Sequence, residues 1–203
     1  MSAENSDQTD TTEKKQLIID TAKKLFLEKG FANTSLNLII KSAGISKGLI
    51  YYHFENKDEL GIKVLESVLN DEIKDFDSFG QLINSISDKS IILSKLDEYL
   101  DHLFSTTMQD YSTMPVIIDL LLNLKSKESK LKVREIYVNY IDKIANFLKL
   151  LEIEKPTLNA KLIVSILDGI MYLNMALDET LTQSESKHVI HALKCMVGLE
   201  ERK

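Results

Sequence analysis

The apolar positions of this chain recur at the three- and four-residue spacing that is typical of α-helices. No segment alternates apolar and polar residues over the length that a half-buried β-strand requires. With its caps and breaks, the pattern predicts about nine helices and no sheet, over residues 11–29, 36–43, 47–53, 57–75, 90–108, 114–124, 128–151, 157–179 and 185–201. We therefore expect an all-α fold.

Polar and turn-forming residues mark where the helices stop. Residues 1–10 are polar and lack periodicity, so we expect a disordered lead. Gly30 is placed to end the first helix and Gly44 the second. The periodic signal fades over residues 77–90, which predicts a loop with a helical turn.

Residues 34–60 contain two short predicted helices joined by a tripeptide centred on Gly44. Gly44 can adopt the backbone conformation of a tight turn, and Ile45 can fill the angle between the helices. The second helix opens with one cation, Lys47, between two small residues. Such an end can approach a DNA groove closely, and its free N–H groups and positive dipole end favour a phosphate. The segment therefore predicts a helix-turn-helix motif.

Polar side chains just after this motif add donors. Tyr51, Tyr52 and His53 offer hydroxyl and imidazole groups one turn further along. A core position is the alternative for Tyr51, and a plain surface position is the alternative for Lys57, but we favour phosphate contacts for both. Phe54 is expected in the core.

The distribution of charge along the chain supports a nucleic-acid partner, although the net charge does not. The chain carries a net charge of −6, whereas residues 11–57 hold eight lysines and four acidic residues, so that the rest of the chain carries −10. A basic segment in an otherwise acidic chain is the charge distribution that contact with nucleic-acid phosphates requires. By itself the signal is weak, since charge runs are usually solvated faces.

Composition excludes several other classes of protein. The apolar fraction of 44%, with two prolines and seven glycines, is that of a globular chain. A single cysteine, Cys195, excludes a disulfide framework and suits a reducing compartment. The first residues lack the apolar region of a signal peptide, and no run approaches the roughly 18 apolar residues of a membrane span. We expect a cytoplasmic protein without contact to a membrane.

The motif region resembles the TetR/AcrR family of bacterial transcriptional regulators. The resemblance is carried by Gly30-Phe31, Thr34-Ser35-Leu36, Ile39, Ala43-Gly44-Ile45-Ser46-Lys47-Gly48, Tyr51, Phe54, Lys57 and Leu60. In addition, Leu167-Asp168-Gly169-Ile170 resembles a stretch of the family's penultimate helix. The resemblance implies an all-helical homodimer that represses promoters and releases a near-palindromic DNA operator when a small molecule binds its C-terminal domain.

The same resemblance implies a division of the chain and a set of DNA-facing residues. Residues 11–56 would form the helix-turn-helix DNA-binding domain and residues 57–203 the ligand-binding and dimerisation domain. The DNA-facing set would be Ser35, Ser46, Lys47, Gly48, Leu49, Tyr51, Tyr52, His53 and Lys57. Two residues depart from the family pattern: Ile40 stands where alanine is usual, and Leu49 where threonine or serine is frequent, which leaves the base preference open.

A dimer interface is predicted on the last two helices. Apolar residues surround most of the helix at 157–179, which therefore needs cover on two sides. Ser165 and Gly169 would let a partner helix approach closely. The predicted interface residues are Leu162, Ser165, Ile166, Gly169, Ile170, Leu173, Val189, Leu193 and Met196.

A lipophilic ligand pocket is predicted among the helices between residues 90 and 179, where methionines and aromatic residues accumulate. Methionine adapts to irregular space, and tyrosine joins an apolar ring to a polar tip. The predicted lining is Phe104, Met108, Tyr111, Met114, Tyr137, Tyr140, Tyr172 and Met175. For any single one of these residues an ordinary core position is the better interpretation, and it is the group as a whole that predicts a pocket.

No pattern indicates catalysis, a cofactor or a metal. The sequence contains no Gly-rich phosphate loop, no G-x-S-x-G nucleophile elbow and no H-E-x-x-H zinc motif. His188, His191 and Cys195 share one helical stripe and could hold zinc, but a polar or interfacial face explains them better. We therefore expect no metal site and no enzyme. The alternatives to a DNA-binding regulator are an all-helical ligand-sequestering module and an enzyme, which leave the basic helix-turn-helix unexplained.

Overall fold

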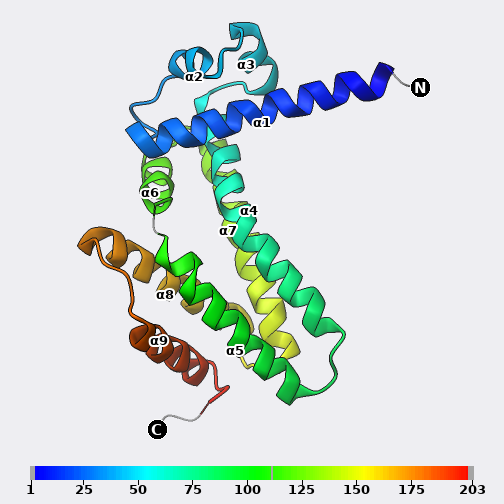
Figure 1. Cartoon of the computed structure of the whole chain (residues 1–203), viewed down its shortest axis with the longest axis vertical. Coiled ribbons are helices and arrows are strands. Elements are labelled where there is room, and N and C mark those ends of the chain that lie inside the picture. The colour runs from blue at the N-terminus through cyan, green and yellow to red at the C-terminus, as the bar shows by residue number, and fades with distance from the viewer. Residues whose placement is uncertain (1–2, 111, 201–203) are drawn as a thin grey trace. The chain divides into compact units, whose positions relative to one another are not determined.

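The computed structural model describes residues 3–110 and 112–200, and every regular element within them is helical. Figure 1 labels these helices along the chain. The elements are α1 (Ala3–Lys29), α2 (Leu36–Ala43), α3 (Lys47–His53), α4 (Lys57–Asn84), α5 (Lys89–Ser105), the 3₁₀ turn η1 (Thr107–Gln109), α6 (Met114–Asn123), α7 (Lys127–Leu150), α8 (Pro156–Leu177) and α9 (Gln183–Met196). The predicted all-α fold is confirmed.

The chain divides into two compact units. The first comprises Met1–Asn70 and Pro115–Arg134, and the second Asp71–Met114 and Glu135–Lys203. Helices α4 and α7 contribute residues to both units, because each continues across a division. The first unit continues past the boundary expected at residue 56, because the start of α4 and residues of α6 contact the connection between α1 and α2.

The core of the first unit forms where α1, α4 and α6 approach one another. Phe26 and Phe31 are 1% exposed, and their rings meet edge to face at 5.1 Å between centroids. A Cβ added at Gly61 of α4 would lie 2.6 Å from Leu120 of α6 and 2.8 Å from Phe31. Glycine at position 61 therefore permits a close approach that any side chain would prevent.

The turn between α2 and α3 has the predicted geometry. Gly44 adopts φ 66° and ψ 29°, the left-handed conformation that ends α2, and its N–H donates to the carbonyl of Ile40. The Ile45 N–H also donates to that carbonyl, at 3.2 Å. Helix α3 begins after Ser46, whose Oγ accepts the Leu49 N–H at 3.2 Å. The helix-turn-helix is confirmed.

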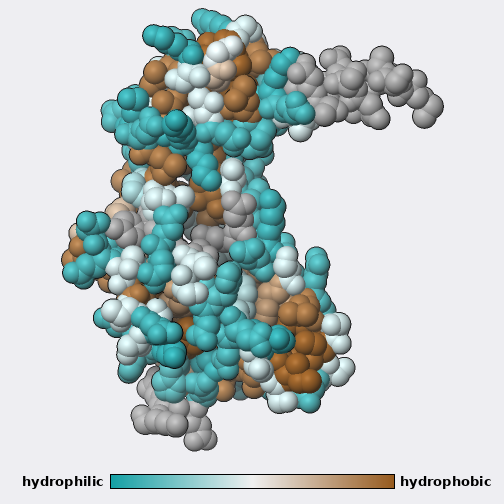
Figure 2. Space-filling model, in the orientation of Figure 1, coloured by the Kyte–Doolittle hydropathy of each residue, from teal (hydrophilic) through white to brown (hydrophobic). Residues whose placement is uncertain are grey.

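The second unit is centred on aromatic rings from α4, α5 and α7. Phe79 stacks on Tyr99 at 4.6 Å between centroids and meets Phe147 edge to face at 5.4 Å. Figure 2 shows apolar side chains at the surface where α4 ends and α5 begins, a region in which Leu82 and Ile91 are half exposed.

Helix ends differ from the sequence prediction at three places. Helix α1 begins at Ala3, so residues 3–10 of the predicted disordered lead are helical. Helix α4 continues to Asn84 through the predicted loop, because Phe79 and Ile83 remain on its buried stripe. Helix α9 ends at Met196 rather than residue 201.

Helix α8 leaves a large apolar surface uncovered. It is long and apolar enough to cross a membrane by length and composition alone, and 28% of its most apolar window is buried. Lys161 and Asp168 interrupt its apolar run, but its mean hydropathy still reaches that of a span. Helices in protein cores and at protein–protein interfaces can be as apolar as α8, so its composition does not by itself indicate a membrane span.

Candidate nucleic-acid interface and ligand pocket

Helix α3 presents a polar surface on a buried anchor. Ile50 and Phe54 are 0% and 1% exposed and fix the helix to the first unit. On its other side Lys47 and Gly48 are exposed, and Tyr52 is 75% exposed. The end of α3 that bears Lys47 is therefore available to a large partner, as the sequence predicted.

Lys47 and Tyr51 act as a pair on this surface. The Lys47 Nζ lies 5.8 Å from the centroid of the Tyr51 ring, at the four-residue spacing that brings helical side chains together. Tyr51 is 48% exposed, so it is not the core aromatic that was its alternative. Its ring can hold the ammonium in place while its hydroxyl stays free to donate outward.

Ser35 and Ser46 are helix caps, as predicted. The Ser35 Oγ accepts the Leu38 N–H at 3.2 Å and begins α2. Ser46 does the same for α3. Because each hydroxyl accepts in its cap, its proton remains available to a phosphate oxygen. Leu49, also in the predicted set, is half-buried on α3.

Gly48 leaves the N-terminal turn of α3 without a side chain at that position. A Cβ added there would meet only the Ser46 Oγ, at the ordinary contact distance of 3.9 Å. The protein itself therefore does not require glycine at this position. The space matters only to something that approaches α3 from outside.

His53 is placed differently from the prediction. Its Nε2 is buried and has no hydrogen-bond partner in the described part of the chain. Burial, with a smaller effect from Lys15, lowers the pKa of His53. The Tyr52 ring meets the imidazole edge to face at 4.9 Å. In this conformation Nε2 is not an outward-facing donor, because that atom is buried although His53 as a whole is half-buried.

Lys57 also has a different role from the predicted phosphate contact. Its Nζ donates to the carbonyls of Phe31, Ala32 and Thr34 at 2.8, 3.3 and 3.0 Å. It also lies 4.3 Å from the centroid of the Phe31 ring. An ammonium has three N–H donors, and all three are satisfied here. Desolvation, followed by repulsion from Lys125, lowers the pKa of Lys57. The ammonium holds the connection between α1 and α2 in place.

Two carboxylates complete this arrangement, and sequence reasoning missed both. The Asp119 Oδ2 accepts the Ala32 N–H at 3.0 Å. The Asp58 Oδ2 accepts the N–H groups of Lys125 and Ser126 at 2.9 and 3.3 Å, just before α7 begins. These contacts join segments 67 to 87 residues apart, so no local pattern could have signalled them.

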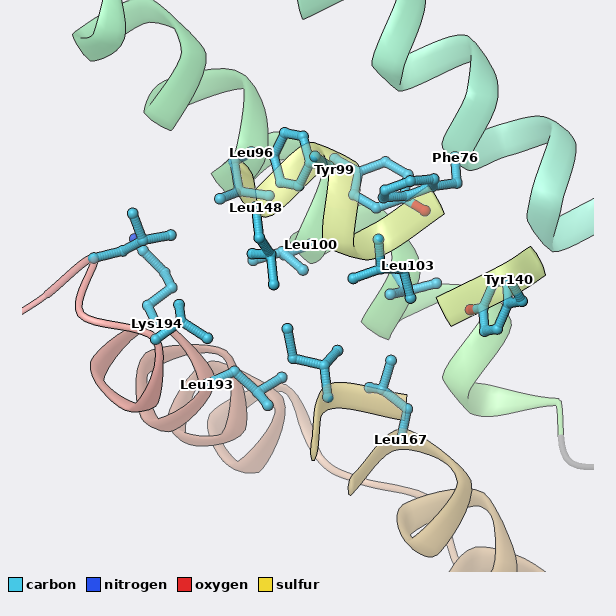
Figure 3. A pocket seen from close by; sticks show the side chains of 15 residues that line it. Phe76, Leu96, Tyr99, Leu100, Leu103, Tyr140, Leu148, Leu167, Leu193 and Lys194 are labelled. Atoms are coloured by element: carbon cyan, nitrogen blue, oxygen red, sulfur yellow. The ribbon is translucent and has the colours of Figure 1, made fainter. Parts of the chain in front are cut away.

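The second unit contains an apolar cavity of about 90 Å³ between α4, α5, α7, α8 and α9. Figure 3 shows Leu167 and Leu193 pointing toward Leu100 and Leu103 across it. Lys194 is the one cation in the lining among the described residues. The volume is below the roughly 300–1,000 Å³ of typical small-molecule sites, so a ligand of that size requires side chains to move.

The cavity differs from the predicted one. Of the predicted lining only Tyr140 contributes to it. Phe104, Met108 and Met114 are buried in packing elsewhere, whereas Tyr172 is 52% exposed. Tyr137 and Met175 are half-buried away from the cavity lining, and Tyr111 lies outside the described residues. Methionine and tyrosine content therefore did not identify the helix faces that line this cavity.

The predicted dimer residues divide between two environments. Leu162 and Leu173 are 42% and 54% exposed on α8, and Ser165 is exposed beside them. Ile166, Gly169 and Ile170 are half-buried on α8, and Val189 and Met196 on α9. Leu193 is instead 7% exposed and lines the cavity within its own unit, so its assignment to an interface is wrong.

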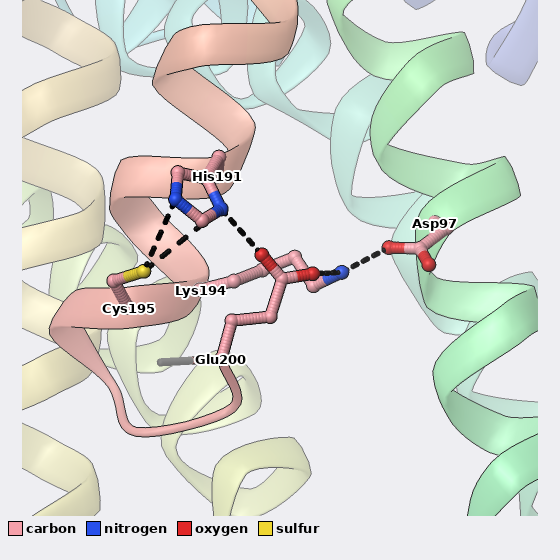
Figure 4. Close-up of polar contacts among 5 residues, drawn as sticks. All are labelled: Asp97, His191, Lys194, Cys195 and Glu200. Atoms are coloured by element: carbon pink, nitrogen blue, oxygen red, sulfur yellow. Dashed lines mark hydrogen bonds and ion pairs between the residues drawn. The ribbon is translucent and has the colours of Figure 1, made fainter. Parts of the chain in front are cut away.

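A polar network lies at the C-terminal end of α9 (Figure 4). Lys194, whose side chain is 11% exposed, pairs with Asp97 of α5 at 2.6 Å and with Glu200. Burial opposes its charge, but the bonds to the two carboxylates outweigh burial and raise the pKa of Lys194. Glu200 also contacts the His191 Nδ1 at 2.6 Å, and the Cys195 Sγ lies 3.6 Å from the His191 Nε2.

Comparison with known proteins agrees with the geometry of the first unit. Residues 18–63 match the family of bacterial regulatory proteins described as the tetR family. The negative transcriptional regulator IcaR of the Staphylococcus epidermidis biofilm operon is 46% identical over 56 residues, 28% of this chain and 30% of IcaR. A fatty acid metabolism regulator of Bacillus subtilis is 27% identical over 130 residues, 63% of each chain. The matches thus span less than two thirds of either relative.

Solved structures extend the likeness to the whole fold. The fatty acid degradation regulator FadR of Bacillus halodurans has a TM-score of 0.68 at 21% identity, covering 94% of this chain and 97% of that one. The helical fold with its helix-turn-helix is thus similar to that of bacterial helix-turn-helix regulatory proteins. Within that class, the likeness is to the TetR/AcrR family, and it is carried by residues 18–63.

Proposed function

We propose that this chain is a ligand-responsive DNA-binding transcriptional regulator, a repressor that leaves a near-palindromic operator when a small lipophilic molecule binds. The observation that carries the proposal is α3: a buried anchor at Ile50 supports an exposed end that bears Lys47 and a sterically free Gly48. A short helix that is slim and positive at its N-terminal end suits a DNA major groove.

The proposed DNA contacts follow from the exposed chemistry. Lys47, steadied by Tyr51, binds a backbone phosphate, and the hydroxyls of Ser35 and Ser46 donate to others. Gly48 and Leu49 face the base edges, and the hydroxyls of Tyr51 and Tyr52 reach phosphates one turn further along. Lys57 supports these groups from inside the unit and is not itself proposed as a contact.

A homodimer is part of the proposal, because one short helix reads too few base pairs for useful specificity. The apolar face of α8 provides the interface, with Leu162, Leu173 and Leu177 between 42% and 64% exposed. Gly169 has open space where a Cβ would be, which leaves room for a partner helix. Burying this face against a second copy also explains an apolar helix in a protein proposed to be cytoplasmic.

The effector is proposed to be lipophilic because the cavity is almost wholly apolar. The Bacillus subtilis and Bacillus halodurans relatives, named as regulators of fatty acid metabolism and degradation, support a lipophilic compound. The DNA-bound form would then have the small cavity, and the ligand would favour a form with an enlarged one. A preference of roughly 3 kcal/mol would weaken DNA binding about 100-fold. No enzymatic role is proposed, since the relatives found are regulators.

The test starts from DNA, because the operator is not identified. The full chain is used to select binding sites from a random duplex library, and the selected duplex is then titrated by fluorescence anisotropy at several salt concentrations. Lys47→Ala is expected to weaken binding and to reduce the salt slope by about 1. Lys95→Ala, which makes the same charge change in the second unit, is the control. Failure to enrich any duplex, or equal effects of the two variants, would contradict the proposal.

A further inference from the structure

Three metal-ligating side chains of different chemistry meet at the C-terminal end of α9 (Figure 4). They are His191, Cys195 and Glu200, and one ligand atom of each lies within 4.8 Å of the other two. His191 and Cys195 are four residues apart on one helix, so their side chains share a face. An imidazole nitrogen, a thiolate and a carboxylate form a donor set that zinc accepts.

A backbone turn brings the third donor back to the helix. Gly198 has φ +81°, its N–H donates to the Cys195 carbonyl at 3.2 Å, and the Leu199 N–H donates to the Lys194 carbonyl at 2.8 Å. This pair of bonds is the Schellman motif that ends many helices. The motif reverses the chain and sets Glu200 over the last turn of α9, beside His191.

The spacing of the donors is close to that around a zinc ion. Tetrahedral zinc with bonds of about 2.3 Å to sulfur and about 2.0–2.1 Å to nitrogen holds those two atoms about 3.6 Å apart. The His191 Nδ1, which is the nitrogen that faces Glu200, lies 3.9 Å from the Cys195 Sγ. The His191 Nδ1 and the Glu200 Oε2 are closer, at 2.6 Å, so these two side chains must separate by rotation to admit an ion.

Neighbouring charges hold the carboxylate and balance an ion. Lys194 pairs with one oxygen of Glu200, while the other oxygen faces His191. Asp97 in turn pairs with Lys194 at 2.6 Å. Outer groups of this kind orient the ligands of metal sites. With the thiol of Cys195 deprotonated, the two carboxylates, the thiolate, the ammonium and a divalent ion add to zero charge.

We propose that His191, Cys195 and Glu200 form a zinc site at the C-terminal end of α9, with the fourth position open to water. His188 is not a ligand: it lies one turn away, and its Nδ1 contacts the Ser184 carbonyl at 3.0 Å. The sequence pattern grouped His188 with the other two and had no signal for Glu200, because the turn at Gly198 decides where Glu200 lies. The site stands independently of the proposed DNA binding.

The test measures metal affinity of the full chain without a histidine tag. The untagged protein is titrated with Co²⁺, whose thiolate charge-transfer band reports a Cys–metal bond, and Zn²⁺ affinity is measured by competition with a chromophoric chelator. One ion per chain is expected, with a thiolate band that Zn²⁺ abolishes. His191→Ala, Cys195→Ser and Glu200→Gln are each expected to lower the affinity at least about 10-fold, the lower end of what even outer-shell changes cost.

Two further variants separate a built site from an incidental cluster. His188→Ala removes a histidine from the same helix and should leave the affinity unchanged. Gly198→Ala keeps every ligand but strains the turn, since φ +81° disfavours a side chain, and should weaken binding. The proposal is overturned if the protein shows no thiolate band with Co²⁺, or if His188→Ala and His191→Ala lower the affinity equally.

Discussion

Replacing Lys57 with methionine removes the ammonium that holds the connection between α1 and α2. Methionine keeps most of the length and the apolar stem of lysine, so the change isolates the charged group. The carbonyls of Phe31, Ala32 and Thr34 lose their shared donor, and the Phe31 ring loses the cation above it. We therefore expect Lys57→Met to destabilise the first unit without removing a direct contact to DNA.

The magnitude follows from the burial of these bonds. A hydrogen bond from a charged donor contributes about 1.5–3 kcal/mol when shielded, and an exposed charge interaction about 0–1 kcal/mol. The bonds to Phe31 and Thr34 are partly buried and the one to Ala32 is exposed. The contact with the Phe31 ring adds roughly 0.5–1 kcal/mol. Because water reaches part of the ammonium, we expect a net loss of about 2–3 kcal/mol in the free energy of unfolding.

The assay is urea denaturation followed by far-UV circular dichroism at a fixed protein concentration. Lys63→Met is the control, because Lys63 pairs with Glu66 one turn along its own helix, at 2.6 Å, and its replacement should cost less than about 1 kcal/mol. Hydrogen exchange of the Thr34 amide, which donates to the Phe31 carbonyl, reports the local effect. If Lys57→Met is as stable as Lys63→Met but binds DNA poorly, Lys57 is a phosphate ligand and our assignment is wrong.

Four further predictions address other features. Gly48→Ala should raise the free energy of unfolding by about 0.5–1 kcal/mol, because alanine favours a helix and the site has room for a methyl group. The same variant should weaken DNA binding, and an unchanged DNA affinity in an anisotropy titration would remove Gly48 from the interface. Gly169→Leu fits the single chain but should prevent dimers, so a variant that sediments as a dimer at micromolar concentration would exclude this face. Because the pKa of His53 in the folded chain lies below its ordinary value of 6.5, the unfolded chain binds a proton at higher pH than the folded chain does. The free energy of unfolding should therefore fall as the pH drops below about 6.5. His53→Gln should reduce this pH dependence in urea denaturation. Leu103→Trp should fill the cavity and reduce the thermal shift given by lipophilic compounds, whereas Met175→Trp should not, and the reverse order would return the pocket to its sequence-predicted place.

Local patterns were sufficient for the elements and for the motif. The caps at Ser35 and Ser46 and the turn at Gly44 each involve residues within a few positions of one another, so their chemistry is legible in the sequence. The same reasoning failed where packing overrides local signals. Residues 77–84 contain polar residues and a glycine that suggest a loop, but the burial of Phe79 and Ile83 keeps them helical.

The site residues show the same division. Exposed side chains on α3 follow from helical periodicity, and Lys47, Tyr51 and Tyr52 lie where the pattern placed them. The positions of Lys57 and of the cavity depend on which distant segments pack together. A lysine at the start of a helix has the same local sequence whether it faces a phosphate or three carbonyls of another loop. Only the contacts across 23 to 26 residues distinguish these cases.

The first unit is discontinuous in the chain, and this affects how it forms during synthesis. Leu120 covers Gly61 and Phe31, and Asp119 holds Ala32, but all of α6 is translated after residue 70. At about 5–20 residues per second, a ribosome needs about 3–13 seconds to pass from Asn70 to Arg134. The nascent helix-turn-helix keeps an apolar surface open for that time. A fragment that ends at Asn70 should therefore fail to fold on its own, and messenger changes that slow translation between these residues should lengthen the period in which chaperones or proteases can engage the chain.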